Sequence, residues 1–275
     1  MKIALCLSGY FANAGGAGAS QLAYKYIEHK ILKDNNVDVF VHSWDLDHEQ
    51  MVNDLYQPKS TRFEPQYQFE KELTEFDEEW FNEGFDRGST MYRTNTIYRG
   101  LSQLCSRKRT IALKSQFEED NNFKYDCVIL GRFDLGTRGK EHPQVYYATN
   151  INFDPTLDMN YLYAGYWNQF NHGYPDHWFY SNSENMDTVG ALYDAVFDYY
   201  QPQSEYVAAV TTGWPESSAN NPFSNEIELA PKWRSPNLKT HGRWECIDNH
   251  KLYKWHFMQT GLHSKAKFVD IRENV

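Results

Sequence analysis

Arg132 and Asp134 are the residues whose types and spacing first suggest chemistry. They follow an apolar run at residues 127–130, with Gly131 between. The carboxyl end of an internal strand is a good place for a carboxylate that holds a hard divalent cation on a diphosphate. An arginine beside it could neutralise the same phosphates. The alternative is a structural Arg–Asp pair, although burying such a pair seldom stabilises a fold.

A glycine-rich loop is the second candidate. It reads SGYFANAGGAGAS at residues 8–20 and follows the first apolar run of the chain. Small residues let a nucleotide approach the backbone, and the N-terminus of a following helix attracts phosphate. The loop is not a G-x-G-x-x-G motif, because Gln21 stands where the third glycine would be, and no Gly-Lys-Ser/Thr follows as in a P-loop. It indicates a phosphate-binding turn, with a flexible strand-to-helix connection as the alternative.

Basic residues gather in a stretch that has no acidic residue between positions 88 and 117. Because guanidinium groups match phosphate oxygens, one or two of these side chains could reach a diphosphate. For most of them the alternative is a solvated helix face. The basic residues are Arg93, Arg99, Arg107, Lys108, Arg109 and Lys114.

The second half of the chain offers a general base and a surface for sugars. Asp176 and His177 open a predicted strand, and either could accept a proton if it faces a cleft. Aromatic residues are dense between positions 160 and 178. Some of these rings belong to the core, and one or two could stack on a sugar.

The elements that must position these residues alternate as in an α/β fold. Near-continuous apolar runs predict strands, and apolar residues at helical spacing predict helices. The order of strand, helix and strand predicts a Rossmann-like, mainly parallel sheet flanked by helices in a single domain. The predicted strands are 2–8, 37–42 and 125–130, and the predicted helices are about 20–33, with Ser20 as N-cap, and 93–117.

The second half continues this alternation. Asp45 to Gly88 reads as short helices within an irregular excursion, and after Gly136 extended and helical pieces follow one another. A glycine just past a helix favours its termination. The predicted strands are 160–164, 177–181 and 267–271, and the predicted helices are 183–200, capped by Ser183, and 250–260, ended by Gly261.

Composition excludes some classes of function. The net charge is −10, which argues against general binding of nucleic acid or an anionic membrane. The four cysteines have no metal or redox spacing, so a reduced, cytoplasmic compartment is expected. The opening apolar run is too short for a signal peptide, and no stretch approaches the ~18 apolar residues of a membrane helix. No transmembrane segment is therefore expected.

Five segments, in this order, carry a resemblance to a known family. They are ALCLSGYF, DVFVHSW, YDCVILGRFDL, DHWFYSNSENMD and KWHFMQTGL. The chain resembles bacterial and viral surface-glycan glycosyltransferases of the GT-A fold, relatives of the lipopolysaccharide-synthesis and capsule-synthesis enzymes. The resemblance implies a nucleotide-sugar donor and a carbohydrate acceptor. It also implies one GT-A-like catalytic domain over 1–275, with a nucleotide-sugar-binding half at 1–136 and an acceptor-side half at 137–275.

The same resemblance implies roles for individual residues. An Asp-x-Asp element at a strand end binds Mn²⁺ or Mg²⁺ in GT-A enzymes, and Arg132-Phe133-Asp134 stands in its place. Asp134 is then the metal ligand, and Arg132 replaces the first acid and is expected to be catalytic. Asp176 matches an acceptor-side carboxylate and is the second expected catalytic residue. The residues expected to hold the nucleotide diphosphate are Ser8, Gly9, Tyr10, Asp45, Arg107 and Arg132.

Two other readings stay open. A Rossmann-type cofactor enzyme, such as a methyltransferase or dehydrogenase, is weakly favoured by the glycine-rich loop. A non-enzymatic glycan-binding protein would use the aromatic segment at 160–178. Arg132 and Asp134 would have no obvious task in a Rossmann-type cofactor enzyme.

Overall fold

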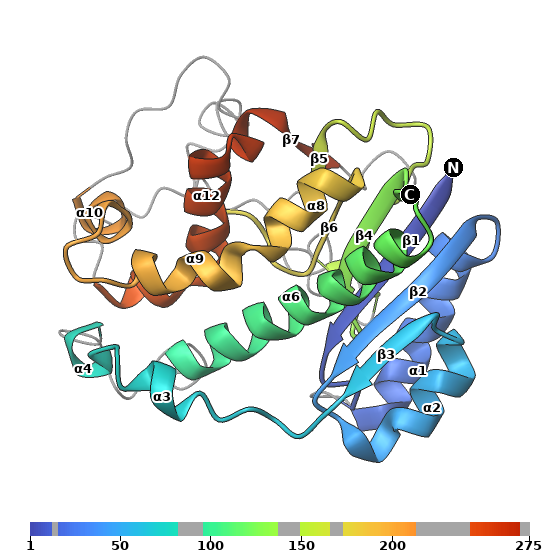
Figure 1. Cartoon of the computed structure of the whole chain (residues 1–275), viewed down its shortest axis with the longest axis horizontal. Coiled ribbons are helices and arrows are strands. Elements are labelled where there is room, and N and C mark those ends of the chain that lie inside the picture. Colours follow the sequence, from blue (N-terminus) through green and yellow to red (C-terminus); the bar gives the residue numbers. More distant parts are fainter. Residues whose placement is uncertain (13–15, 82–95, 137–148, 166–172, 213–242, 270–275) are drawn as a thin grey trace, which may run out of the picture.

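The computed structural model describes residues 1–12, 16–81, 96–136, 149–165, 173–212 and 243–269. These residues form one seven-stranded sheet in the order β3-β2-β1-β4-β6-β5-β7 (Figure 1). Neighbouring strands are parallel except at β6, which runs antiparallel to β4 and β5. The strands are β1 Lys2–Gly9, β2 Asn36–Ser43, β3 Ser60–Phe63, β4 Cys127–Arg132, β5 Leu162–Gly165, β6 Trp178–Ser181 and β7 Ala266–Val269.

The predicted strands 2–8, 37–42 and 125–130 are confirmed as β1, β2 and β4. β1 lies between β2 and β4 and is parallel to both. Its apolar side chains alternate between two hydrophobic cores, with Leu5 and Leu7 on one face and Ala4 and Cys6 on the other. Burial on both faces explains why these strands read as continuous apolar runs.

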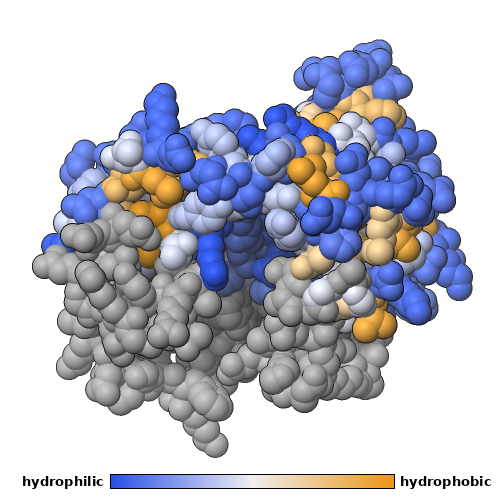
Figure 2. All heavy atoms as spheres, turned by 90° about the horizontal axis from the view of Figure 1, so that it is seen from below, coloured by the Kyte–Doolittle hydropathy of each residue, from blue (hydrophilic) through white to orange (hydrophobic). Residues whose placement is uncertain are grey.

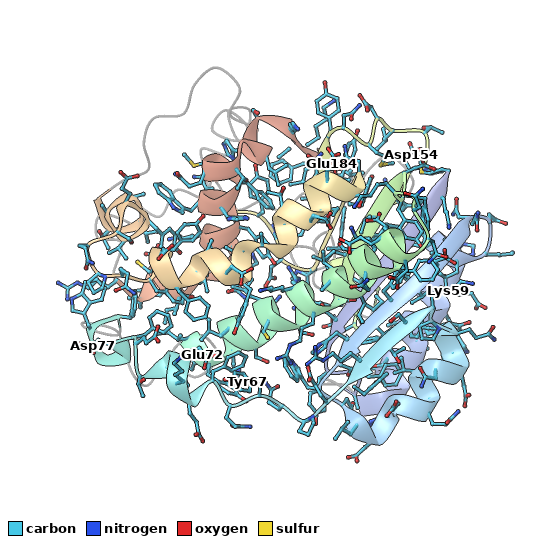
Figure 3. All side chains as sticks on the ribbon, in the orientation of Figure 1. Lys59, Tyr67, Glu72, Asp77, Asp154 and Glu184 are labelled. Carbon is cyan, nitrogen blue, oxygen red and sulfur yellow. The ribbon has the colours of Figure 1, made fainter. Side chains whose placement is uncertain are left out.

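Helices cover both faces of the sheet (Figure 1). On one face, α1 Gly16–Ile27, its π-helical extension η1 Glu28–Leu32, and α2 Glu49–Tyr56 pack on one core. On the other face lie α6 Ile97–Asp120, α8 Ser183–Gly190, α9 Leu192–Tyr199, α10 Glu205–Thr212 and α12 Asn249–Thr260. Figure 3 shows Lys59 beside the strands and Glu184 on α8 at the periphery. The shorter elements are α3 Glu70–Leu73, α4 Glu78–Phe81, and the 3₁₀ turns η2 Leu46–His48, η3 Arg243–Ile247 and η4 Leu262–Lys265.

Two predicted helix caps are wrong. α1 begins at Gly16, so Ser20 lies inside the helix, where its hydroxyl donates to the Phe11 carbonyl. Asn182 caps α8 instead of Ser183, because its side chain accepts the Asn185 amide at 2.9 Å. The predicted helix over 183–200 is also divided, since α8 ends at Gly190 and α9 begins at Leu192.

Other boundaries shift by a few residues. Within the segment predicted to be irregular, β3 adds an edge strand. Thr96 caps α6, and the first residues of the predicted helix, 93–95, lie outside the described residues. Gly261 follows α12 with φ of 77°, as a helix-ending glycine should. In the described part of the chain, no helix is both long enough and apolar enough to cross a bilayer.

Candidate functional site

A cavity of about 680 Å³ opens at the carboxyl edge of β1 and β4. Its described lining comes mainly from the ends of β1 and β4, the first turns of α6, the residues before β6 and the start of α12, with Trp44 after β2 and Gln66 after β3. Figure 2 looks onto a face that is hollowed near its middle, where the described residues are hydrophilic. Because β6 is antiparallel to β4, its amino end lies at the same edge as the carboxyl end of β4, and Gly131 pairs with Trp178.

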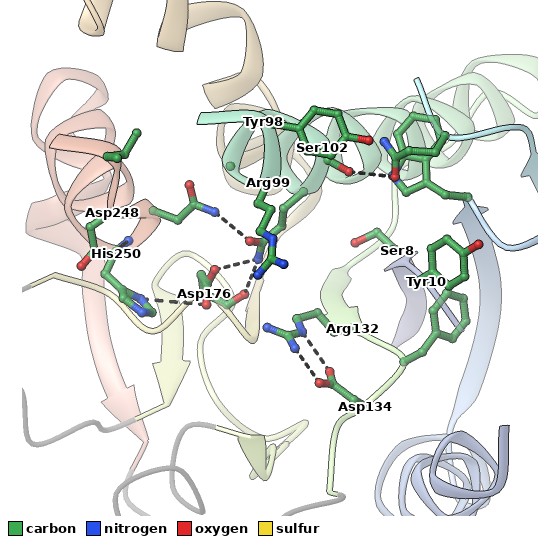
Figure 4. A pocket seen from close by; sticks show the side chains of 18 residues that line it. Ser8, Tyr10, Tyr98, Arg99, Ser102, Arg132, Asp134, Asp176, Asp248 and His250 are labelled. Carbon is green, nitrogen blue, oxygen red and sulfur yellow. Dashed lines mark hydrogen bonds and ion pairs between the residues drawn. The ribbon is translucent and has the colours of Figure 1, made fainter. Parts of the chain in front are cut away.

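The loop after β1 forms one wall of this cavity. Ser8, Gly9 and Tyr10 all line it, and Asp134 lines it with them (Figure 4). Gly9 has φ of +107°, which favours glycine. The Gly9 amide donates to Ser106 Oγ at 2.9 Å, and its carbonyl accepts from Ser43 Oγ at 2.8 Å. The backbone beneath the exposed Tyr10 ring is therefore held on both sides.

Arg132 and Asp134 form a two-pronged ion pair on the cavity wall (Figure 4). Arg132 Nε donates to Asp134 Oδ1 at 2.9 Å, and Nη2 donates to Oδ2 at 2.5 Å. Burial alone would raise the pKa of Asp134, but the adjacent guanidinium outweighs it and lowers that pKa. Both groups are therefore charged. Arg132 and Asp134 form an ion pair with each other and also line the cavity.

Asp176 stands on the opposite wall, where Arg99 and His250 approach it (Figure 4). Gln103 Nε2 donates to Asp176 Oδ2 at 2.7 Å, and Asn249 Nδ2 donates to Gln103 Oε1 at 2.7 Å. His250 Nδ1 is 3.9 Å from Asp176 Oδ1. α6 and α12 thus fix the carboxylate together.

The charge state of this wall follows from its neighbours. Burial would raise the pKa of Asp176, but surrounding histidines and arginines outweigh burial and hold that pKa well below its usual range. Burial, and then Arg132, lower the pKa of His177 to about 3, so that ring is neutral at neutral pH. The groups that lower the pKa of Asp176 are His250, His177, Arg107 and Arg132.

Two residues predicted to contact the nucleotide do not line the cavity. Asp45 is buried and accepts the Ala12 amide at 2.8 Å and His48 Nδ1 at 2.9 Å, so it secures the loop after β1 from below. Arg107 is also buried and donates to the Tyr253 hydroxyl at 2.7 Å and to the Asp176 carbonyl. It supports the wall that carries Asp176 from behind.

The basic stretch is divided by its position on α6. Arg99, in the first turn, lines the cavity, whereas Lys114 is fully buried in ion pairs with Glu118 and Asp187. Lys108 pairs with Asp194 at the surface. Arg93 lies outside the described residues. Neither a solvated face nor a phosphate-binding face describes the whole stretch.

Sequence reasoning did not single out Arg99, Gln103 or His250 as cavity residues. The predicted start of the long helix could have favoured Arg99, because a helix N-terminus attracts anions. No spacing in the sequence relates His250 to Asp176. Of the aromatic segment, Tyr163 and Tyr174 are core residues, and 166–172 lie outside the described residues.

Mn²⁺ and Mg²⁺ bind through several oxygen ligands. Among the described residues, no group of three or more His, Cys, Asp or Glu could hold a metal ion alone. The described lining carries two arginines against three aspartates, so a diphosphate would meet excess negative charge unless a cation accompanied it. Mg²⁺ commonly binds through one or two carboxylates plus substrate phosphates. Asp134, whose two oxygens already accept from Arg132, would supply one such carboxylate, and substrate phosphates would have to supply further ligands.

Comparisons with known proteins add no relative. No family model, no curated protein and no solved structure matches the chain.

Proposed function

We propose that the protein is a glycosyltransferase that moves a sugar from a nucleoside diphosphate to a carbohydrate acceptor. The observation that carries the proposal is one cavity with Arg132 and the loop after β1 on one side, and Asp176, His250 and Arg99 on the other (Figure 4). Its volume, about 680 Å³, is in the range of small-molecule sites. It also lies where open α/β sheets bind ligands. The GT-A fold is part of the proposal.

The donor side follows from the wall of Ser8, Gly9, Tyr10 and Arg132. The exposed Tyr10 ring offers a flat apolar face to a base or sugar. Arg132 and Arg99 neutralise the diphosphate, helped by the positive end of the α6 dipole. A divalent metal held by Asp134 would supply further positive charge to the departing diphosphate. The prediction of Mn²⁺ or Mg²⁺ therefore remains part of this proposal.

The acceptor side follows from Asp176 and His250. During transfer, the acceptor oxygen bonds to the sugar carbon, the sugar–phosphate bond breaks and its electron pair leaves on the nucleoside diphosphate. The acceptor hydroxyl must release its proton. Asp176 has a pKa too low for a good base at neutral pH. His250 donates from Nδ1 to the Tyr174 carbonyl at 2.7 Å, so Nε2 is its basic nitrogen. In the proposal His250 takes the proton and Asp176 stabilises the imidazolium.

A thermal-shift screen of nucleotide sugars, with and without Mn²⁺, tests this assignment. A ligand at about 100 times its Kd stabilises a protein by ~2.7 kcal/mol, which such a screen detects. Mn²⁺ alone should give no shift and should enhance the shift given by a nucleoside diphosphate. Arg99→Ala and Arg132→Ala should weaken the response. Lys108→Ala is the matched control, because Lys108 lies on the same helix but pairs with Asp194.

The rival functions give different results in the same screen. Stabilisation by NAD or S-adenosylmethionine, without a response to nucleotide sugars, would identify a Rossmann-type cofactor enzyme. Binding of oligosaccharides without any nucleotide response would identify a glycan-binding protein. Either result would replace the glycosyltransferase proposal.

A further inference from the structure

A chain of hydrogen bonds through the buried residues His42 and Ser106 ends on the Gly9 amide at the cavity. Gly9 donates to Ser106 Oγ on α6 at 2.9 Å. Ser106 Oγ lies 2.7 Å from His42 Nδ1 on β2, and His42 Nε2 lies 2.8 Å from Glu64 Oε1 just after β3. Ser106 and His42 are completely buried. Gly9, His42 and Glu64 lie at the ends of the neighbouring strands β1, β2 and β3, and Ser106 lies on α6.

The direction of every hydrogen bond in this chain can be assigned. Burial would raise the pKa of Glu64, but hydrogen bonds from His42 and Arg62 outweigh it, so the carboxylate is charged and can only accept. His42 Nε2 must then carry the proton. Burial lowers the pKa of His42 to about 4, so its Nδ1 is a bare acceptor at neutral pH. Ser106 consequently donates to His42 and accepts from Gly9.

Other charged groups hold the outer end of the chain. Arg62 binds Glu64 Oε2 through Nε at 3.0 Å and Nη2 at 2.8 Å. Arg109 pairs with Glu64 Oε1 and lies over the Trp44 ring at 4.9 Å. These contacts fix the carboxylate that orients His42, and Trp44 itself lines the cavity.

We propose that Glu64, His42 and Ser106 are positioning residues that fix the Gly9 peptide and thereby the donor-side wall of the cavity. The effect on ligand binding rests on the proposed function, whereas the proton assignment does not. Ser106 is not a nucleophile in this inference, because it is buried, is absent from the described lining, and already accepts from Gly9. Through these hydrogen bonds Glu64 influences the cavity, although it is not among the described lining residues.

The first experiment needs no ligand. The ¹⁵N shifts of His42 at neutral pH should show the tautomer with hydrogen on Nε2. Ser106→Ala should speed hydrogen exchange of the Gly9 amide by at least about tenfold, because its acceptor is gone. Ser183→Ala is the matched control, since Ser183 is an equally buried hydroxyl that donates to Glu118 away from the cavity. An Nδ1–H tautomer, or unchanged Gly9 exchange in Ser106→Ala, would overturn the assignment.

The second experiment measures affinity for inorganic pyrophosphate with Mn²⁺, by calorimetry on the full chain. Ser106→Ala should raise Kd about tenfold, the effect of about one well-placed hydrogen bond, and Ser183→Ala should leave Kd within twofold. Equal Kd values for these two variants would refute the positioning role. Absence of binding by the unmodified protein would count against the proposed function and the affinity effect, and the proton assignment would then be judged by the first experiment.

A second pair of variants guards against misfolding of the buried sites. Glu64 is 21% exposed, so its replacement is tolerated better than replacement of Ser106 or His42. Glu64→Ala should weaken pyrophosphate binding, whereas Glu64→Gln, placed to keep an acceptor for His42 Nε2, should restore most of the affinity. If Glu64→Gln and Glu64→Ala behave alike, Glu64 does not act through His42.

Discussion

Helix α6 carries two buried polar networks of similar composition. The pocket network joins Ser106 to His42 and Glu64. The distal network joins Lys114 to Glu118, Ser183 and Asp187. The two centres, Ser106 and Lys114, are eight residues apart, or about 12 Å along the helix at 1.5 Å per residue.

The networks differ in what lies at their ends. The pocket network ends on the Gly9 amide, part of the cavity wall. The distal network ends on the first turn of α8 and on the Tyr125 amide, which Glu118 accepts at 2.9 Å. The composition of a buried polar network therefore says little about its function, which depends on the groups at its ends. The first network should control binding, and the second should control the docking of α8 on α6.

The largest effect is expected from Lys114→Met. Glu118 would keep its charge in a fully buried position without the buried cation that pairs with it, and breaking such a pair costs about 3–5 kcal/mol. Urea denaturation measures this change in the free energy of unfolding. Nucleotide affinity of the folded protein should stay within about twofold. A variant that loses affinity while keeping its stability would reverse the roles of the two networks.

Next in size, for the proposed glycosyltransferase, is the effect of Asp134→Asn on turnover. The change keeps the shape but removes the charge, and losing one electrostatic group of this kind lowers turnover by about 10²–10³. The Mn²⁺ response should weaken with it. Asp154→Asn is the control, because Asp154 is a surface carboxylate bonded to Thr156 outside the cavity. Full activity with an unchanged Mn²⁺ response would remove Asp134 from the mechanism, and simple unfolding would make it a structural partner of Arg132.

The pH dependence of stability should separate the networks. Between pH 6.5 and about 4 the unfolded chain protonates His42 and the folded protein does not, so stability falls as pH falls, by roughly 3 kcal/mol in all. Burial would raise the pKa of Glu118, but donors including the Tyr125 amide outweigh it, so its stabilisation is present above about pH 4.5 and is lost below.

Denaturation at several pH values, for the unmodified protein, His42→Gln and Glu118→Gln, isolates these contributions. His42→Gln should flatten the curve between pH 6.5 and 4, where other buried histidines such as His263 also contribute. Glu118→Gln should flatten it only below about pH 4.5. A curve for His42→Gln that parallels that of the unmodified protein across the window would show that His42 is charged in the fold.

The smallest effect is expected from Lys124→Ala. Lys124 donates to Glu118 at 2.9 Å, but its side chain is 55% exposed. Exposed ion pairs contribute about 0–1 kcal/mol. The change in unfolding free energy should thus be several times smaller than for Lys114→Met, although both lysines bind one carboxylate. Equal effects would mean that burial does not set the strength of this network.

Much of the fold could be predicted from the sequence, and the exceptions have physical reasons. β1, β2 and β4 are buried on both faces and therefore read as apolar runs. β3 has four residues, STRF, at the sheet edge, where neither face demands an apolar pattern. The break between α8 and α9 falls at Gly190 and Ala191, and the apolar pattern continues past it at Leu192 and Val196, so a single glycine is its only mark in the sequence.

The cavity could be predicted in part. The rule for carboxyl ends of strands brought Ser8, Gly9, Tyr10 and Asp134 together. The same rule could not show which arginine of α6 faces these residues. Arg99 lines the cavity, whereas Arg107, about 12 Å further along the helix, does not.

His250 could not be predicted because it reaches the cavity only through the docking of α12. That docking depends on contacts such as Asn249 with Gln103, 146 residues apart in the chain.

This separation also bears on how the cavity forms during folding. Gln103 and Asp176 are 73 residues apart, and Arg107 and Tyr253 are 146 apart, so the wall around Asp176 closes loops that span much of the chain. Closing such loops costs entropy before any contact repays it, so these contacts should form late. A ligand that spans both walls would hold α12 against local opening. Hydrogen exchange in α12 should therefore slow when the cavity is filled, even at amides that touch no ligand.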